Sequence, residues 1–353
     1  MFGRALRVSV AIVAISVFLI GLTFGFGAAK ASVNSVVVHE SRLSVSAESL
    51  VSSDPNETQW LGFNNAQGIA VGDFNNDGLN ETAISEGAAG IVLIVKSDGT
   101  TVLKQLSGLE NPFGVSIGDF NNDGLNEIAI AESNGSRVTV VKSDGTTIVK
   151  QFLGLQNPRG VAIGDFNNNG LNEIAISDRG TGTVWVLKPD GTVIQKWTGV
   201  TGAGGVAIGD FDNDHLNEIA FADASTGRVY VYNSNGTLVK MLTGLGHPEG
   251  LAIGDYNNDG LNDIAVTDPI AGTVTVLNSN GTIVAQWTGL DSPTGVAIGD
   301  YNNDGRNALL FTEDNEVTIV PEFAVLTWLL VATTVSLLVA VGKKSLARGK
   351  VKS

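Results

Sequence analysis

The stretch GDFNNDGLNEIAI, residues 118–130, recurs along the chain with small changes and determines the fold. Its opening aspartate falls at six places that lie 46, 46, 45, 45 and 45 residues apart. These six residues are Asp73, Asp119, Asp165, Asp210, Asp255 and Asp300. A repeat of this length indicates a propeller or a stack of repeated units.

Each repeat unit reads as four strands. Residues 160–199, for example, contain four short runs rich in Val, Ile, Thr and Trp that are bounded by Gly, Asp, Asn or Pro. In the first five units, Asp-Gly or Asn-Gly joins the third run to the fourth and supplies the positive φ of a tight hairpin. Four strands in about 45 residues predict a propeller blade.

The two ends of the repeat region complement each other. The sixth unit stops at Val320 without a fourth strand, whereas residues 57–63 resemble fourth-strand residues such as 285–290. Pairing the two would close a ring and leave no open sheet edge. We therefore predict an all-β, six-bladed propeller over residues 56–320. An open stack of repeats is the alternative, but it does not account for the missing and the donated strand.

The quoted stretch also carries a cation-binding pattern. Within residues 119–127, side-chain oxygens occupy positions 1, 3, 5 and 9, a glycine stands at position 6, and position 7 can offer its carbonyl. Calcium takes six to eight oxygen ligands at about 2.3–2.6 Å. The alternative is that such Asp-Asn-Gly runs are only good turns. A turn alone does not require an acid or amide at all four positions in five copies, so we predict about five Ca²⁺ ions as the cofactor.

The pattern D-x-[DN]-x-[DN]-G-x-x-[DE] between strands resembles the calcium-binding FG-GAP repeats of integrin α-subunits and of many bacterial and archaeal surface proteins. The P-x-G-V-A-I frame around it resembles NHL-type blades. This resemblance implies structural calcium sites that are distinct from the ligand site. In the first three loops it implies the ligands Asp73, Asn75, Asp77, Leu79, Glu81, Asp119, Asn121, Asp123, Leu125, Glu127, Asp165, Asn167, Asn169, Leu171 and Glu173. In the last three it implies Asp210, Asp212, Asp214, Leu216, Glu218, Asp255, Asn257, Asp259, Leu261, Asp263, Asp300, Asn302 and Asp304.

Three loops depart from the pattern. The third has Asn169 in place of a carboxylate and is expected to bind more weakly. The fourth has His215 at the glycine position, which histidine tolerates because it is among the residues that enter the left-handed region. The sixth has Ala308 at position 9, so we expect it not to hold metal tightly.

The ends of the chain predict export and anchoring. Residues 1–31 read as a signal peptide, with an uncleaved signal anchor as the alternative, and 32–55 form a leader. Residues 321–342 contain Pro-Glu-Phe and an apolar run that predicts a transmembrane helix, and 343–353 form a basic tail predicted to be cytoplasmic. This end resembles the sorting signals called PEF-CTERM, which a transpeptidase processes. A plain membrane anchor is the alternative to a processed signal. For the apolar run itself, the alternative is a buried globular helix. Either anchored form predicts a location at the cell surface.

The net charge of the chain between the predicted signal and the basic tail limits which class of partner it can bind. Without the predicted signal and tail, 13 basic residues remain against 36 acidic ones, a net charge of −23. Such a surface disfavours nucleic acid and favours cations. The chain has no cysteine and therefore no disulfide, so we expect bound calcium to stabilise the fold instead.

Two sets of positions lie on the face opposite the predicted metal loops. The residue before the recurring Gly of each interblade loop differs in every blade, and the candidate ligand-binding residues among the six are Phe113, Arg159 and Glu249. Drift at an exposed loop is the alternative. The second strand ends in an acid in every blade, which predicts a turn cap or, alternatively, a negative mouth. These acids are Glu86, Glu132, Asp178, Asp223, Asp268 and Glu313.

The sequence offers no catalytic signature. The three histidines are widely separated, and no nucleophile motif or phosphate-binding loop accompanies them. We predict a non-enzymatic, calcium-stabilised binding or adhesion module whose partner is an extracellular protein or glycan. The alternatives are a structural protein of the cell envelope and an enzyme that acts on polysaccharides.

Overall fold

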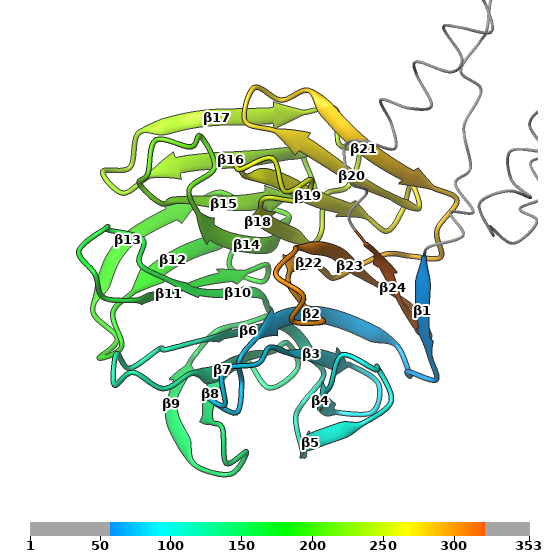
Figure 1. Cartoon of the computed structure of the whole chain (residues 1–353). Coiled ribbons are helices and arrows are strands. Elements are labelled where there is room, and N and C mark those ends of the chain that lie inside the picture. The colour runs from blue at the N-terminus through cyan, green and yellow to red at the C-terminus, as the bar shows by residue number, and fades with distance from the viewer. Residues whose placement is uncertain (1–56, 322–353) are drawn as a thin grey trace, which may run out of the picture. The chain divides into compact units, whose positions relative to one another are not determined.

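The computed structural model describes residues 57–321, and all regular structure in that range is β-strand. Its strands form six four-stranded antiparallel sheets, the blades, arranged around a common axis (Figure 1). The prediction of an all-β, six-bladed propeller is therefore confirmed. Between residues 57 and 321 there is no helix long and apolar enough to cross a membrane. The predicted signal peptide, transmembrane helix and basic tail lie outside the described residues.

Each blade runs from an inner strand at the axis to an outer strand at the rim. Blades 1 and 2 contain β2 (Ala66–Gly72), β3 (Glu81–Glu86), β4 (Ile91–Val95), β5 (Val102–Ser107), β6 (Pro112–Gly118), β7 (Glu127–Glu132), β8 (Arg137–Lys142) and β9 (Ile148–Leu153). Blades 3 and 4 contain β10 (Pro158–Gly164), β11 (Glu173–Asp178), β12 (Thr183–Leu187), β13 (Val193–Thr198), β14 (Ala203–Gly209), β15 (Glu218–Asp223), β16 (Arg228–Asn233) and β17 (Leu238–Thr243). Blades 5 and 6 contain β18 (Leu251–Gly254), β19 (Asp263–Asp268), β20 (Thr273–Asn278), β21 (Ile283–Thr288), β22 (Val296–Gly299), β23 (Ala308–Glu313), β24 (Glu316–Val320) and β1 (Thr58–Leu61).

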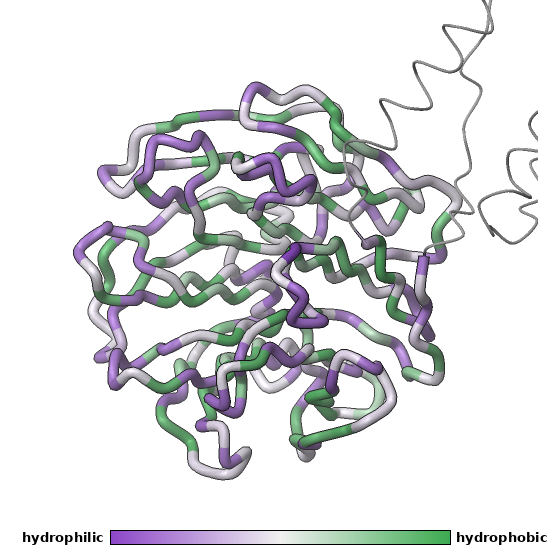
Figure 2. The backbone as a smooth tube through the Cα atoms, viewed as in Figure 1, coloured by the Kyte–Doolittle hydropathy of each residue, from purple (hydrophilic) through white to green (hydrophobic). Residues whose placement is uncertain are grey.

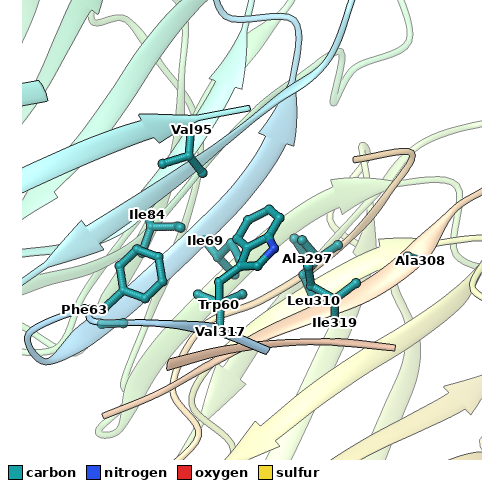
Figure 3. Close-up of a cluster of buried hydrophobic side chains, with 11 residues drawn as sticks. Trp60, Phe63, Ile69, Ile84, Val95, Ala297, Ala308, Leu310, Val317 and Ile319 are labelled. Atoms are coloured by element: carbon teal, nitrogen blue, oxygen red, sulfur yellow. The ribbon is translucent and has the colours of Figure 1, made fainter. Parts of the chain in front are cut away.

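The first strand of the chain closes the ring, as the sequence predicts. β1 pairs antiparallel with β24, so that Trp60 lies opposite Val317, and β1 becomes the outer strand of blade 6 (Figure 1). Trp60 is buried in a cluster that joins blade 1, through residues such as Ile84, to blade 6, through residues such as Leu310 (Figure 3). The donated strand thus brings its own core residue to the joint between the two ends.

The core lies between successive blades rather than in one centre. The second strand of every blade is buried along its whole length, whereas the residues of outer strands such as β9 and β13 are half-buried or exposed. In Figure 2 the apolar stretches follow the strands, and the polar stretches lie mostly in the connecting loops. Position 2 of each metal loop adds an aromatic side chain to these clusters, and Phe120, for example, packs with Val161 and Ile174 of the next blade.

Glycine allows the inner strands to meet backbone to backbone at the axis. A Cβ on Gly114 would lie 2.4 Å from the carbonyl oxygen of Arg159 in the next blade, and one on Gly68 would lie 2.2 Å from that of Phe113. The residue before this glycine lies in a β-bulge in blades 1 to 4, because register shifts there between positions such as Pro158 and Val161. A bulge changes the direction in which a side chain points, and here the bulges direct the residue before the glycine toward the central opening.

Candidate functional site

The six loops that the sequence predicts to bind metal, here still called metal loops, share one backbone conformation. In the loop that starts at Asp73, the Asp77 N–H donates to Asp73 Oδ1 at 3.0 Å and the Gly78 N–H donates to Asp73 Oδ2 at 2.8 Å. The Leu79 N–H then donates to Asp77 Oδ1 at 2.9 Å. The same three contacts recur in the other five loops. These bonds wrap the chain around the side chains at odd positions.

The acid at position 9 comes from the next strand and is buried. Glu81, the first residue of β3, is 3% exposed and accepts hydrogen bonds from the Phe74 N–H and from the Asn75 side chain. Glu127, Glu173, Glu218 and Asp263 occupy the same place in the next four loops and are also buried. Buried carboxylates need partners that stabilise their charge.

The fourth loop has the most concentrated acids. Carboxylate oxygens of Asp210, Asp212 and Glu218 lie within 4.8 Å of one another, a spacing that suits a shared cation. Burial raises the pKa of the Glu218 carboxyl to about 7, and the charge of Asp212 adds to the shift. His215 in this loop has a φ of 73°, so it adopts the left-handed conformation as predicted.

Two loops contain buried oxygens without hydrogen-bond partners. Asn121 Oδ1 at position 3 of the second loop and Asp263 Oδ2 at position 9 of the fifth have none among the described residues. Burial also raises the pKa of Asp263 to about 6, with Asp259 and Asp255 contributing. Orphaned oxygens at ligand positions are what a calcium loop presents to its ion, so the residues present fit calcium.

The sixth loop forms the same turn as the other loops although it has no acid at position 9. It keeps the hydrogen bonds from the Asp304 and Gly305 N–H groups to Asp300, although position 9 is Ala308. The turn therefore forms without an acid at position 9. The buried acids of the other five loops are not needed for the turn, which weakens the interpretation that these sequences are turns alone.

The asparagines at positions 4 and 8 form a ring that our sequence analysis did not find. At each joint, position 8 of one blade donates its backbone N–H to the side-chain oxygen of position 4 in the preceding blade, as Asn126 does to Asn76 at 2.7 Å. The side chain of Asn126 also donates to the Asp73 carbonyl at 2.8 Å. Asn80 makes both contacts with the sixth loop, through Asn303 and Asp300, and closes the ring. The remaining joints use Asn172, Asn217, Asn262 and Asn307.

A sequence signal for this ring does exist. Asparagine occupies positions 4 and 8 in all six loops, including the sixth, where the acid at position 9 is lost. Position 4 adopts positive φ in every loop, for example 61° at Asn122, a conformation that asparagine tolerates better than most residues. Odd positions thus supply candidate metal ligands, and the asparagines at positions 4 and 8 hold neighbouring blades together.

On the opposite face, the acids at the end of the second strand cap interblade loops. Asp178 accepts the backbone N–H groups of Gln156 and Asn157 at 3.0 and 2.7 Å. Glu132, Asp223, Asp268 and Glu313 accept equivalent bonds in their own blades. These contacts support the turn-cap interpretation of the acidic positions over the negative mouth.

The variable positions converge on a cavity of about 50 Å³ at the central opening, lined by the first inner-strand residues. The three predicted ligand-binding residues, Phe113, Arg159 and Glu249, all line it. The Arg159 guanidinium lies over the Phe113 ring at 4.3 Å from its centroid. Glu249 is 3% exposed, and its Oε2 accepts a hydrogen bond from Arg179 at 2.5 Å. Arg179 was not predicted; it reaches this acid from the turn after β11.

Two buried polar atoms at the opening lack hydrogen-bond partners. Arg159 Nε and Glu249 Oε1 have none in the part of the chain that the structure describes. Burial lowers the pKa of Arg159, while the charge of Glu249 partly offsets that effect. The other two variable side chains at the opening are satisfied, because Gln67 donates to Asn65 and Thr294 to the Gln67 carbonyl.

Comparisons with known proteins agree with this fold. A family model described as FG-GAP-like repeat matches residues 119–176, 165–221, 210–266 and 255–311, which together span more than half of the chain. No curated protein matches the sequence at a significant level.

Among solved structures, similar chains include one from a complex of BBS1N with ARL6DN, with a TM-score of 0.54 and 15% identity over 75% of this chain and 95% of that one. A catalytically inactive variant of virginiamycin B lyase from Staphylococcus aureus with quinupristin has a TM-score of 0.51 and 15% identity over 76% and 99%. A chain of the nidogen/laminin complex has a TM-score of 0.51 and 17% identity over 66% and 84%. At these identities the likeness concerns the fold alone.

Proposed function

The chain belongs to the family of FG-GAP-like repeat proteins, and on this premise we propose that it is a calcium-stabilised propeller that binds a ligand outside the cell. The metal loops would hold the ions, and the face with the central opening would hold the ligand. The extracellular location rests on the signal and anchor segments predicted from the sequence. A glycan or a protein of the cell exterior would be the partner.

The observation that carries the proposal is the difference between the two faces of the propeller. Around the central opening, six blades present six different residues, and two of them, Arg159 and Glu249, keep buried polar atoms unpaired. Leaving such atoms unpaired costs folding free energy of about 1–3 kcal/mol each. A ligand that pairs them would recover that free energy, which supports binding at this opening.

The chain's own residues would bind calcium as follows. In the first five loops, carboxylates at positions 1 and 9, the side-chain oxygens at positions 3 and 5 and the carbonyl at position 7 would hold the ion, with Asn169 in place of the position-5 carboxylate in the third loop. In the second and third loops, the Asn121 and Asn167 side chains donate N–H to the acid at position 9, and a half-turn of each amide would present its oxygen instead. When bound, the ion would neutralise acids that otherwise repel one another.

An array experiment tests the proposal. The full chain would be applied to arrays of glycans and extracellular proteins, in calcium and in EDTA, together with Arg159→Gln at the opening and Lys188→Gln, an exposed residue on the metal-loop side. We expect binding to some array member in calcium that is lost in EDTA and weakened by Arg159→Gln only. Binding that both variants retain would place the ligand elsewhere, and an absence of binding would favour the structural envelope role.

One observation favours an enzyme as the second candidate. His247 Nδ1 lies 3.9 Å from Glu249 Oε2 beside the central opening, and a histidine with a carboxylate can transfer protons. One structure with the same fold is a lyase. Incubation of the full chain with polysaccharides, followed by absorbance of unsaturated products, tests this candidate. We expect no turnover, and a calcium-dependent rise that His247→Ala abolishes would replace the binding proposal.

A further inference from the structure

The central opening contains a cation that lacks an anionic partner. Arg179 pairs with Glu249, but Arg159 contacts the face of Phe113 and leaves Nε unpaired among residues 57–321. With two arginines and one glutamate, the opening carries a net positive charge in a chain whose overall formal charge is −15. A half-buried guanidinium of this kind is completed best by a carboxylate, which can accept two parallel N–H bonds.

The neighbouring acid, Glu249, lacks a hydrogen-bond donor at the same opening. Glu249 is held rigidly, since its backbone N–H donates to the Thr267 carbonyl at 2.9 Å and Arg179 occupies its Oε2. Its Oε1 is buried and has no donor within the described region. Blade 4 contributes no side chain between Arg159 and Glu249, because its variable residue is Gly204, where a Cβ would lie 2.8 Å from the Glu249 carbonyl oxygen. A ligand that fits must therefore offer an acceptor to Arg159 and a donor to Glu249.

The size of the cavity limits what can enter. About 50 Å³ accommodates a few water molecules, at about 10–15 Å³ each by the same measure. A carboxylate group with its last methylene fits such a space, whereas a whole pyranose ring does not. A doubly charged phosphate is disfavoured by the adjacent Glu249.

We propose that the central opening binds an acidic side chain of a partner protein, whose carboxylate pairs with Arg159 and whose adjacent backbone N–H donates to Glu249 Oε1. This inference deepens the proposed function and rests on it, because it names the ligand class for the same face. A peptide N–H near a side-chain carboxylate supplies the acceptor and the donor together. The Phe113 ring fixes the guanidinium before the ligand arrives.

The test observes Arg159 directly. The ¹⁵N-labelled full chain in calcium would be titrated with the peptide acetyl-Gly-Glu-Gly-amide, and with acetyl-Gly-Gln-Gly-amide as the uncharged control. The Arg159 Nε–H resonance is identified by its loss in Arg159→Lys. We expect it to shift and saturate with the glutamate peptide, with a Kd on the order of 1 mM, and to remain unmoved by the glutamine peptide.

Variants then distinguish the effect of the Arg159 charge from the effect of a charge elsewhere on the propeller. Arg159→Gln should weaken binding of the glutamate peptide at least tenfold, and Arg159→Lys should give an intermediate loss, because lysine keeps the charge but not the planar fork. The matched control is Arg228→Gln, which removes the same charge from an exposed residue that begins β16 and should bind like the wild type. An equal loss in Arg228→Gln would overturn the assignment.

Other outcomes are equally decisive. A shift with a uronate oligosaccharide but not with the glutamate peptide would replace the protein partner with an acidic glycan. If Arg159 responds to neither probe while the arrays show binding that depends on Arg159, the acidic ligand class is wrong and the proposed function stands. If Arg159 responds to the peptide while no array member binds, the site is correct and the proposed display function is wrong.

Discussion

On the metal-loop face, the side chain at a given loop position is nearly the same in all six blades, whereas around the central opening each blade contributes a different residue. The even loop positions pair with one another from blade to blade, as Asn126 does with Asn76 and Asp73. At the opening, by contrast, Arg159 and Glu249 keep atoms unpaired among the described residues. The hydrogen bonds of the asparagines are thus complete from blade to blade, whereas the central opening has no such repeated set of contacts.

This contrast indicates where folding free energy resides. The asparagine ring contributes two hydrogen bonds at each joint, each worth about 0.5–1.5 kcal/mol net. The opening contributes little, because a buried cation without a full partner costs free energy. Substitution of a ring asparagine should therefore destabilise the fold more than substitution of Arg159 does.

Removal of calcium should have the largest effect. Five ions at ten times their Kd would stabilise the fold by roughly 7 kcal/mol, so EDTA should lower the melting temperature of the full chain by about 15 °C. Scanning calorimetry in calcium and in EDTA measures this difference, and added excess calcium should restore it. Identical melting curves would show that the loops are turns and not ion sites.

Without calcium, stability should fall as pH rises. Burial raises the folded-state pKa of Glu218 from 4.5 to about 7, so the folded state holds this proton more tightly than the unfolded state. The resulting stability is fully present below pH 4.5 and is lost as pH rises through about 7, by on the order of 2–3 kcal/mol.

The pH measurement has an internal control. Melting curves in EDTA at pH 5 and pH 8 should differ less for Glu218→Gln than for the wild type, because the variant has no proton to lose there. Calcium should reverse the trend in the wild type, since the ion binds the deprotonated acid. A metal-free protein that gains stability between pH 5 and pH 8 would contradict the assignment.

The asparagine ring should come next. Asn126→Ala removes the donor to the Asp73 carbonyl and should cost about 1–3 kcal/mol of unfolding free energy, with or without calcium. Asn64→Ala is the matched control, because Asn64 is exposed in an interblade loop. Urea denaturation of both variants measures the difference, and equal midpoints would mean that the ring does not hold the blades together.

Sequence periodicity predicted the fold because each blade repeats the same local rules. The 45-residue spacing, the Asp-Gly and Asn-Gly hairpins and the strand donated by residues 57–63 were sufficient for the blade number and for the closure of the ring. The loop pattern also included Asp210, Asp212 and Glu218, whose carboxylate oxygens lie within 4.8 Å of one another, and metal binding by these loops stays a prediction. These features depend on contacts within one blade or between equivalent blades.

What the sequence did not predict depends on contacts between different blades. Arg179 reaches Glu249 from blade 3 to blade 5, and no spacing in the chain marks that pair. The asparagine ring was in principle visible, because Asn stands at positions 4 and 8 of all six loops, but the prediction concerned only the metal-ligand positions and the turn glycine. The cavity and its unpaired atoms follow from inner-strand residues of different blades, such as Arg159 and Glu249, that only the folded ring brings together.

A comparison within the metal-loop face should give a smaller effect. Asp119→Ala and Asp300→Ala remove the same turn hydrogen bonds, from two backbone N–H groups in each loop. Only the second loop has an acid at position 9, so Asp119→Ala should also lose an ion and cost about 1.4 kcal/mol more in calcium. The two variants should melt alike in EDTA. An equal cost in calcium would mean that the second loop binds no more tightly than the sixth.

The smallest effect is expected at the central opening, with Arg159→Met. Methionine keeps an unbranched apolar chain over the Phe113 ring and makes favourable sulfur–aromatic contacts. It also removes a guanidinium whose pKa is lowered by burial, which means that the fold disfavours its charge. The melting temperature should therefore be unchanged or slightly higher, within about 1 kcal/mol, while binding of the glutamate peptide is lost. A loss of stability as large as that of Asn126→Ala would show that Arg159 holds the blades together, and the contrast between a structural face and a binding face would then disappear.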